Sequence, residues 1–239
     1  MLSTKQLRIS IGVTAALGLF IESLGGHDVV TTKLTWSKEV SRVVYRRCLS
    51  CHREGGKAFS LAIYSEARPW AKAIQEAVLR RQMPPWDAVK GFGDFDHDRG
   101  LSQEEIQTIS DWVEGGAPEG DPALMPEAPK AFDSFVAAEP RSWITPDVSR
   151  ESGQKITAKL RVLGIDISRT PEHSAFRLIA STPQGEMIPM IWIRDHSPRS
   201  AQWYAFQSPI ELPAGTKLES FPPIRGLRLG VARGPQPKP

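Results

Sequence analysis

Cys48-Leu49-Ser50-Cys51-His52 reads C-x-x-C-H, and both cysteines of the 239-residue chain lie within it. This is the attachment signature of a c-type haem, since two thiols on one helical turn can add to its two vinyl groups. The next residue then offers an imidazole to the iron. The stretch therefore predicts one covalently attached haem c, held by Cys48 and Cys51, with His52 as the proximal ligand.

Three other uses of a C-x-x-C pair fit this sequence less well. A thioredoxin-like redox pair belongs in a βαβ context, which the flanking residues lack. A closed zinc site needs four ligands, and the sequence contains no second cysteine pair. A disulfide across two intervening residues would be strained.

Composition and charge narrow the class of protein. The length suits about two domains, and 40% of the residues are hydrophobic, as in ordinary globular proteins. The net charge is only +3, with basic and acidic residues interspersed. We therefore expect no nucleic-acid partner.

The N-terminal residues predict export. Lys5 and Arg8 precede an apolar run over residues 9–21, which is shorter than the roughly 20 residues of a membrane span. Residues 1–26 are therefore interpreted as a signal peptide or, if uncleaved, as an anchor in the inner membrane. Because c-type haem is attached outside the cytoplasm, both interpretations place the protein in the periplasm.

Three helices are expected in the first half of the chain. One begins near Ser37 and carries the C-x-x-C-H motif, and a second spans about residues 65–82. The third spans about residues 102–114 and opens with a capping box of Ser102 and Glu105. These helices predict a small all-α haem domain over residues 34–120.

The second half changes to the period-two pattern of strands. Residues 121–150 are rich in proline and are expected to form a linker. Six candidate strands follow, over residues 156–167, 176–182, 187–194, 203–211, 217–221 and 227–232. The fold class is therefore multidomain α + β, with a small all-β sandwich over residues 151–233 and a disordered tail over residues 234–239.

The sixth ligand of the iron decides between an electron carrier and an open site. Met83 is the predicted distal ligand, because Pro84 and Pro85 form a rigid turn directly after it. A thioether ligand favours ferrous iron and raises the reduction potential. His97 is the alternative, and would give a haem with two histidine ligands. The candidate residues for the haem wall are Phe59, Trp70, Trp86, Phe92 and Phe95.

A run of aspartates at residues 94, 96 and 98 partly matches a calcium-binding loop, with Ser102 and Glu105 at later ligand positions. Arg99 stands where such a loop needs a glycine. Solvated turns are therefore the favoured interpretation of these carboxylates.

Several stretches of the first half resemble a family of exported bacterial cytochromes c. The resemblance covers residues 34–122 and rests on YRRCLSCHREGG at 45–56, ARPWAK at 67–72, MPPW at 83–86, GDF at 93–95, LS at 101–102 and DWVEGGAP at 111–118. It implies that the methionine of M-P-P-W, Met83, is the distal haem ligand. In this family the haem domain often precedes a β-sandwich related to copper type II ascorbate-dependent monooxygenases.

The second half resembles that sandwich only in WIRD at 192–195, WYAF at 203–206 and LPAGT at 212–216. The copper enzymes bind metal through several histidines and a methionine, whereas here only His173 and His196 remain, with Met187 and Met190 nearby. The resemblance therefore implies a degenerate sandwich with a docking or structural role.

Three functional hypotheses follow from these observations. The first is a periplasmic monohaem cytochrome c rather than an enzyme. It would carry single electrons between redox partner proteins, within a membrane respiratory or photosynthetic complex. The second is a haem–copper monooxygenase with copper held by His173, His196 and Met190. The third is a structural subunit whose haem is vestigial.

Overall fold

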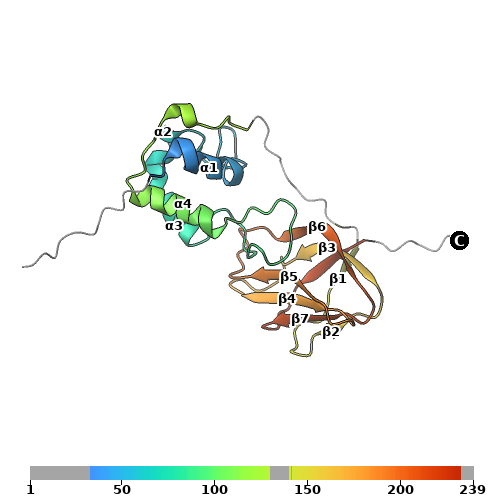
Figure 1. The fold of residues 1–239 in the computed structure, drawn as a ribbon. Helices are drawn as coiled ribbons and strands as arrows, with labels where there is room; N and C mark the ends of the chain where they lie inside the picture. Colours follow the sequence, from blue (N-terminus) through green and yellow to red (C-terminus); the bar gives the residue numbers. More distant parts are fainter. Residues whose placement is uncertain (1–32, 130–139, 141, 233–239) are drawn as a thin grey trace, which may run out of the picture. The chain divides into compact units, whose positions relative to one another are not determined.

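The computed structural model describes residues 33–129, 140 and 142–232. The expected export segment (1–26), part of the linker and the tail (234–239) lie outside these residues. Within the described ranges the helices come first in the chain and the strands follow (Figure 1). No described helix has the length and apolar character needed to cross a membrane. Below, residues 33–129 are called the helical segment and residues 142–232 the β segment.

The first helix begins slightly before the expected Ser37. A π-helix, η1 (Trp36–Val40), continues into α1 (Ser41–Arg47). Thr35 caps η1, because its side chain accepts a hydrogen bond from the amide of Lys38. Ser37 is instead buried, and its hydroxyl donates to the carbonyl of Glu119 at 2.8 Å.

The single helix expected over residues 65–82 is divided into three pieces. They are α2 (Tyr64–Ala67), the 3-10 helix η2 (Arg68–Trp70) and α3 (Ala71–Leu79). The division coincides with Pro69, which has no amide hydrogen to continue the α-helical pattern.

The third helix was predicted correctly. It is α4 (Gln103–Glu114), and its capping box of Ser102 and Glu105 is present. A short 3-10 helix, η3 (Pro122–Leu124), follows. The helical core brings η1 and α4 together. The rings of Trp36 and Trp112 lie 5.9 Å apart, and both are almost completely buried.

Within the residues that the structure describes, eight strands form two four-stranded antiparallel sheets (Figure 1). The first sheet has the order β1-β8-β3-β6 and the second the order β2-β7-β4-β5. The strands are β1 (Ser142–Ile144), β2 (Gln154–Lys155), β3 (Leu160–Asp166), β4 (Phe176–Ser181), β5 (Met187–Ile193), β6 (Trp203–Leu212), β7 (Lys217–Phe221) and β8 (Arg228–Val231).

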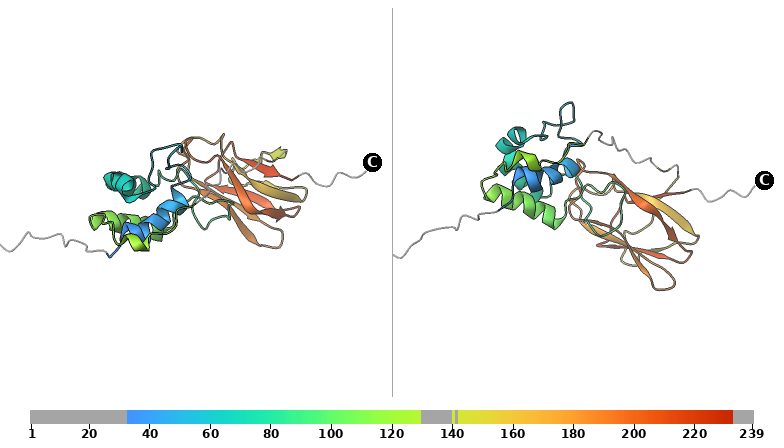
Figure 2. Two further views of the ribbon diagram at one scale, coloured as in Figure 1. Left: turned by 90° about the horizontal axis from the view of Figure 1, so that it is seen from above. Right: turned by 45° about the horizontal axis from the view of Figure 1, so that its top comes forward.

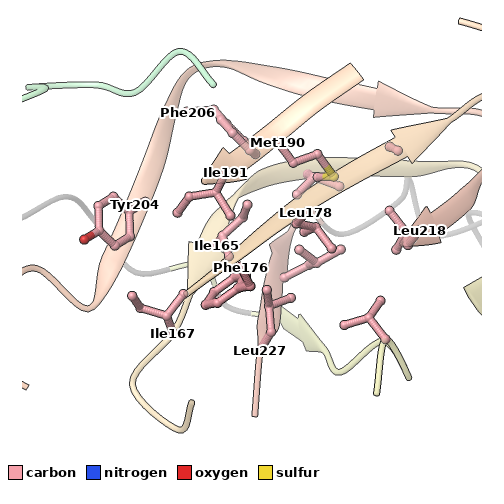
Figure 3. Close-up of a cluster of buried hydrophobic side chains, with 14 of the residues drawn as sticks. Ile165, Ile167, Phe176, Leu178, Met190, Ile191, Tyr204, Phe206, Leu218 and Leu227 are labelled. Atoms are coloured by element: carbon pink, nitrogen blue, oxygen red, sulfur yellow. The ribbon is translucent and has the colours of Figure 1, made fainter. Parts of the chain in front are cut away.

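All six expected strands are present, and two short ones were missed. Strand β1 lies within the segment expected to be a linker, yet it pairs with β8, so the β segment begins before residue 151. The two sheets form two layers (Figure 2) and share one apolar core (Figure 3). Its largest fully buried members include Tyr204, Phe176 and Met190.

The segment between α3 and α4 packs on the β segment. We call residues 84–97 the bridging loop. The amide of Val89 donates to Trp192 of β5 at 2.8 Å, and the amide of Asp96 donates to Ala205 of β6 at 2.9 Å. Because β5 and β6 are each an edge strand, the loop pairs with one edge of each sheet (Figure 1). Its Phe95 is also part of the apolar core.

Candidate haem site

The C-x-x-C-H motif continues α1 as a single turn. The amide of Cys48 donates to Val44 at 2.8 Å, and the amides of Cys51 and His52 both donate to the carbonyl of Cys48, at 3.0 and 2.9 Å. Both cysteines are free thiols rather than a disulfide. The structure therefore brings together the three motif residues predicted from the sequence.

A backbone carbonyl orients the imidazole of His52. Its Nδ1 lies 3.0 Å from the carbonyl oxygen of Phe59. Since a carbonyl oxygen only accepts, this contact places the ring proton on Nδ1 and leaves the lone pair on Nε2. Within the described part of the chain, Nε2 has no hydrogen-bond partner. Metal-binding histidines are commonly held in this way, with the second nitrogen donating to a carbonyl.

The loop after the motif folds tightly against it. The amide of Ala58 donates to Cys51 at 3.1 Å, and that of Leu61 donates to His52 at 3.1 Å. Gly56 is required for this packing, because a Cβ at that position would lie 2.4 Å from the carbonyl oxygen of Cys51. This loop places the Phe59 carbonyl within hydrogen-bonding distance of Nδ1 of His52.

A buried carboxylate fixes the end of α1 just before the motif. Glu105 of α4 accepts hydrogen bonds from Arg47 at 3.0 Å and Arg46 at 3.2 Å. Arg47 also donates to the carbonyl of Asp98 at 2.8 Å. Because Glu105 caps its own helix through the amide of Ser102 at 2.8 Å, one side chain joins the start of α4 to the end of α1, just before the C-x-x-C-H motif.

Burial, with a smaller contribution from the charge of Glu105 and against that of Arg47, raises the pKa of the Cys48 thiol to about 12. The uncharged thiol is therefore the form of Cys48 at neutral pH. A cysteine in such surroundings is a poor free nucleophile.

Large apolar side chains are exposed beside His52. The ring of Phe59 makes an edge contact with the imidazole at 5.0 Å and lies 4.7 Å from the ring of Trp70. Phe59 and Trp70 remain 49% and 47% exposed. Exposed apolar side chains gathered on one surface mark a binding site. With two thiols and an available imidazole nitrogen, the residues here fit a covalently attached haem.

Met83 lies just beyond α3, where its amide donates to Ala77 at 3.3 Å. It lines a cavity of about 760 Å³, whose apolar wall includes Val78, Leu101 and Ile106. These three residues belong to the same cluster as Val43 of α1, one turn before Cys48. The cavity lining does not include the three motif residues, so the structure does not itself join Met83 to His52.

Three of the five expected haem-wall aromatics contact the β segment, and one of them, Trp86, also lines the cavity beside Met83. The rings of Trp86 and Phe95 lie 4.7 and 5.5 Å from that of Tyr204, and the ring of Phe92 lies 5.9 Å from that of Trp192. Tyr204 and Trp192 both belong to the β segment. Only Phe59 and Trp70 lie beside the motif. His97, the alternative distal ligand, is in the bridging loop, with Nε2 3.3 Å from Asp96.

The calcium interpretation finds no support. Asp98 accepts hydrogen bonds from Lys90 at 2.6 Å and from the amide of Gly100 at 2.7 Å. Glu105 accepts hydrogen bonds from two arginines. In the described ranges, no group of three or more His, Cys, Asp or Glu side chains is placed to hold a metal ion.

The three residues suggested for copper lie in different surroundings. Met190 is completely buried in the core of the β segment, and His196 is 2% exposed. His173 is on the surface, where Nδ1 lies 3.0 Å from Asp195. The proximity of Asp195 raises the pKa of His173 through a hydrogen bond and its charge.

Sequence analysis missed the Phe59 carbonyl, Gly56 and the link from Glu105 to Arg47. Glu105 was identified through its capping box, but nothing in the sequence indicated its second partner. The backbone contact of Gly56 with Cys51 has no signal in the sequence, because a glycine pair after a helix is also common where no close contact exists.

The chain was compared with protein-family models, curated proteins and solved structures, and none of them matched.

Proposed function

We propose that the protein is a c-type cytochrome that carries single electrons through one covalent haem. Cys48 and Cys51 would hold the haem, His52 would be the proximal ligand and Met83 the distal ligand. The observation that carries the proposal is the C-x-x-C-H turn, in which the Phe59 carbonyl fixes Nδ1 of His52 and leaves Nε2 available. The haem would supply one-electron chemistry at a moderately high potential, given a methionine ligand.

The chain's own residues would position and shield this group. The Phe59 carbonyl would keep His52 in one tautomer and one ring orientation. The rings of Phe59 and Trp70 would exclude water from the proximal edge. Arg47 and Glu105 would hold the attachment turn against α4, so that ligand geometry changes little between the two redox states.

The finer assignment of the fold belongs to the same proposal. The helical segment would be a small all-α cytochrome c domain of the exported bacterial type, and the two sheets of the β segment a degenerate sandwich. Export would place the protein in the periplasm, with residues 1–26 as a signal peptide or membrane anchor. Its partners would be redox proteins, in a membrane respiratory or photosynthetic complex, that meet the haem edge.

The test is an absorption spectrum of the protein matured with a haem-attachment system, oxidised and then reduced. We expect covalently bound haem and, in the oxidised state, the weak red band of sulfur bound to ferric iron. Met83→Ala should remove the band. Met187→Ala is the matched control, because Met187 is a 72% exposed methionine of the β segment. No covalent haem would refute the proposal, and a band that survives in Met83→Ala would refute the distal ligand.

A further inference from the structure

We propose that the β segment anchors the loop that carries the distal ligand, with Asp87 and Tyr204 as positioning residues that hold Met83 at the sixth site. This inference rests on the proposed function. It assigns the β segment a role in ligand geometry in place of a docking role.

The contacts begin two residues after Met83. The carbonyl of Pro85 accepts a hydrogen bond from the amide of Ala201 at 3.2 Å. The amide of Asp87 donates to the hydroxyl of Tyr204 at 3.2 Å, and Oδ2 of Asp87 accepts from the amide of Ser197 at 2.8 Å. Both the backbone and the side chain of Asp87 are therefore held by the β segment.

These polar contacts are buried. The side chain of Asp87 is 7% exposed, and Oδ2 lies 3.7 Å from Nδ1 of the buried His196. Tyr204 is completely buried. Hydrogen bonds in such surroundings are costly to leave unmade, because the remaining partner cannot turn to water. The Asp87 position is accordingly well determined.

Aromatic packing holds the same part of the loop. The ring of Trp86 lies at 67° to that of Tyr204, with centroids 4.7 Å apart. Phe95 stacks on Phe206 at 5.5 Å and also touches Tyr204. Tyr204 is thus the common support of Trp86, Asp87 and Phe95 (Figure 3 shows Tyr204 and Phe206 within the core).

Met83 lies close in sequence to these anchored residues, so their contacts restrict the position of its thioether. Only Pro84 separates Met83 from the first anchored residue, and proline fixes its own φ angle. On the other side, the amide of Met83 is hydrogen-bonded to the end of α3. Met83 is therefore restrained on both sides in the sequence. Loss of the Asp87 contacts should remove the restraint on the C-terminal side.

The experiment uses the full-length holoprotein in the ferric state, with imidazole as a probe that competes with Met83 for the iron. The variants are Tyr204→Phe, which removes one hydroxyl, and Asp87→Ala, which removes the carboxylate. We expect the apparent affinity for imidazole to rise about tenfold in each, the equivalent of one lost buried hydrogen bond. The red band should weaken and the reduction potential fall in parallel.

Two controls separate positioning from general stability. Tyr64→Phe makes the same chemical change at a hydroxyl that donates to Ala117 at 3.0 Å within the helical segment. Leu218→Ala weakens the core of the β segment on the side away from Tyr204 (Figure 3). Both should leave imidazole affinity unchanged, although Leu218→Ala lowers the urea midpoint.

The outcomes distinguish the two proposals. If the wild-type protein shows the red band and the Tyr204 and Asp87 variants bind imidazole like wild type, the anchor is overturned and the electron carrier stands. If Leu218→Ala raises imidazole affinity as much as they do, the effect is one of stability, and the anchor is again overturned. If the wild-type protein lacks a band that depends on Met83, the ligand assignment fails and the anchor fails with it.

Discussion

The carboxylate of Glu105 performs two tasks, and two substitutions can separate them. It caps α4 through the amide of Ser102 and pairs with Arg47 and Arg46 at the end of α1. Glutamine at this position can still complete a capping box, whereas alanine cannot. Glu105→Gln therefore removes only the charge, and Glu105→Ala removes the charge and the cap.

The structure sets the size of each effect. Glu105 and Arg47 are 9% and 19% exposed, so their bond is a charge-assisted contact with little solvent around it, for which about 2 kcal/mol is expected. Arg46 is 64% exposed and adds little. The cap contributes about 1 kcal/mol. We expect Glu105→Gln to cost about 2 kcal/mol and Glu105→Ala about 3 kcal/mol.

Urea unfolding of the holoprotein at neutral pH measures both values. With a slope of about 2 kcal/mol/M, the Glu105→Gln midpoint should fall by about 1 M. The matched control is Glu104→Gln, in the same first turn of α4 but exposed, which should cost no more than about 0.5 kcal/mol. A Glu105→Gln midpoint equal to that of the control would refute the reasoning, because the ion pair would then contribute nothing.

Two further predictions concern the attachment loop and the anchor. Gly56→Ala should strongly lower the yield of covalent haem, since its Cβ would clash with Cys51, whereas Gly55→Ala, in open space with φ +67°, should keep the haem at a cost of about 1 kcal/mol. Equal haem yields in the two would contradict this. Burial raises the pKa of Asp87, so the folded state binds its proton more tightly and stability falls as pH rises above the ordinary value near 4. Asp87→Asn should therefore lose less stability than wild type between pH 4 and pH 7 in urea titrations, and parallel curves would argue against it.

Local sequence patterns were sufficient to predict many of the helices and strands. The capping box of Ser102 and Glu105 predicted where α4 begins, because both halves of the motif are adjacent in the sequence. The alternation of apolar and polar residues likewise located the six longer strands. Strands β1 and β2 escaped detection because three and two residues are too short to show a period.

The bridging loop shows why its contacts with the β segment could not be predicted from the sequence. Trp86 and Phe95 are close in sequence to Met83, and an aromatic residue near a predicted ligand suggests a haem wall. Their actual partners, Tyr204 and Phe206, lie more than a hundred residues away. No periodicity or spacing connects them, because tertiary pairing of a loop with two sheet edges leaves no local pattern.

The same separation has a consequence for the order in which the protein matures. Ser197 and Tyr204 lie 110 and 117 positions after their partner Asp87. During synthesis from the N-terminus, the C-x-x-C-H turn and Met83 emerge well before the strands that hold the bridging loop. In the proposed cytochrome, the two thioether bonds to haem could form before β5 and β6 have folded, and binding of Met83 to the iron would follow once these strands hold the bridging loop.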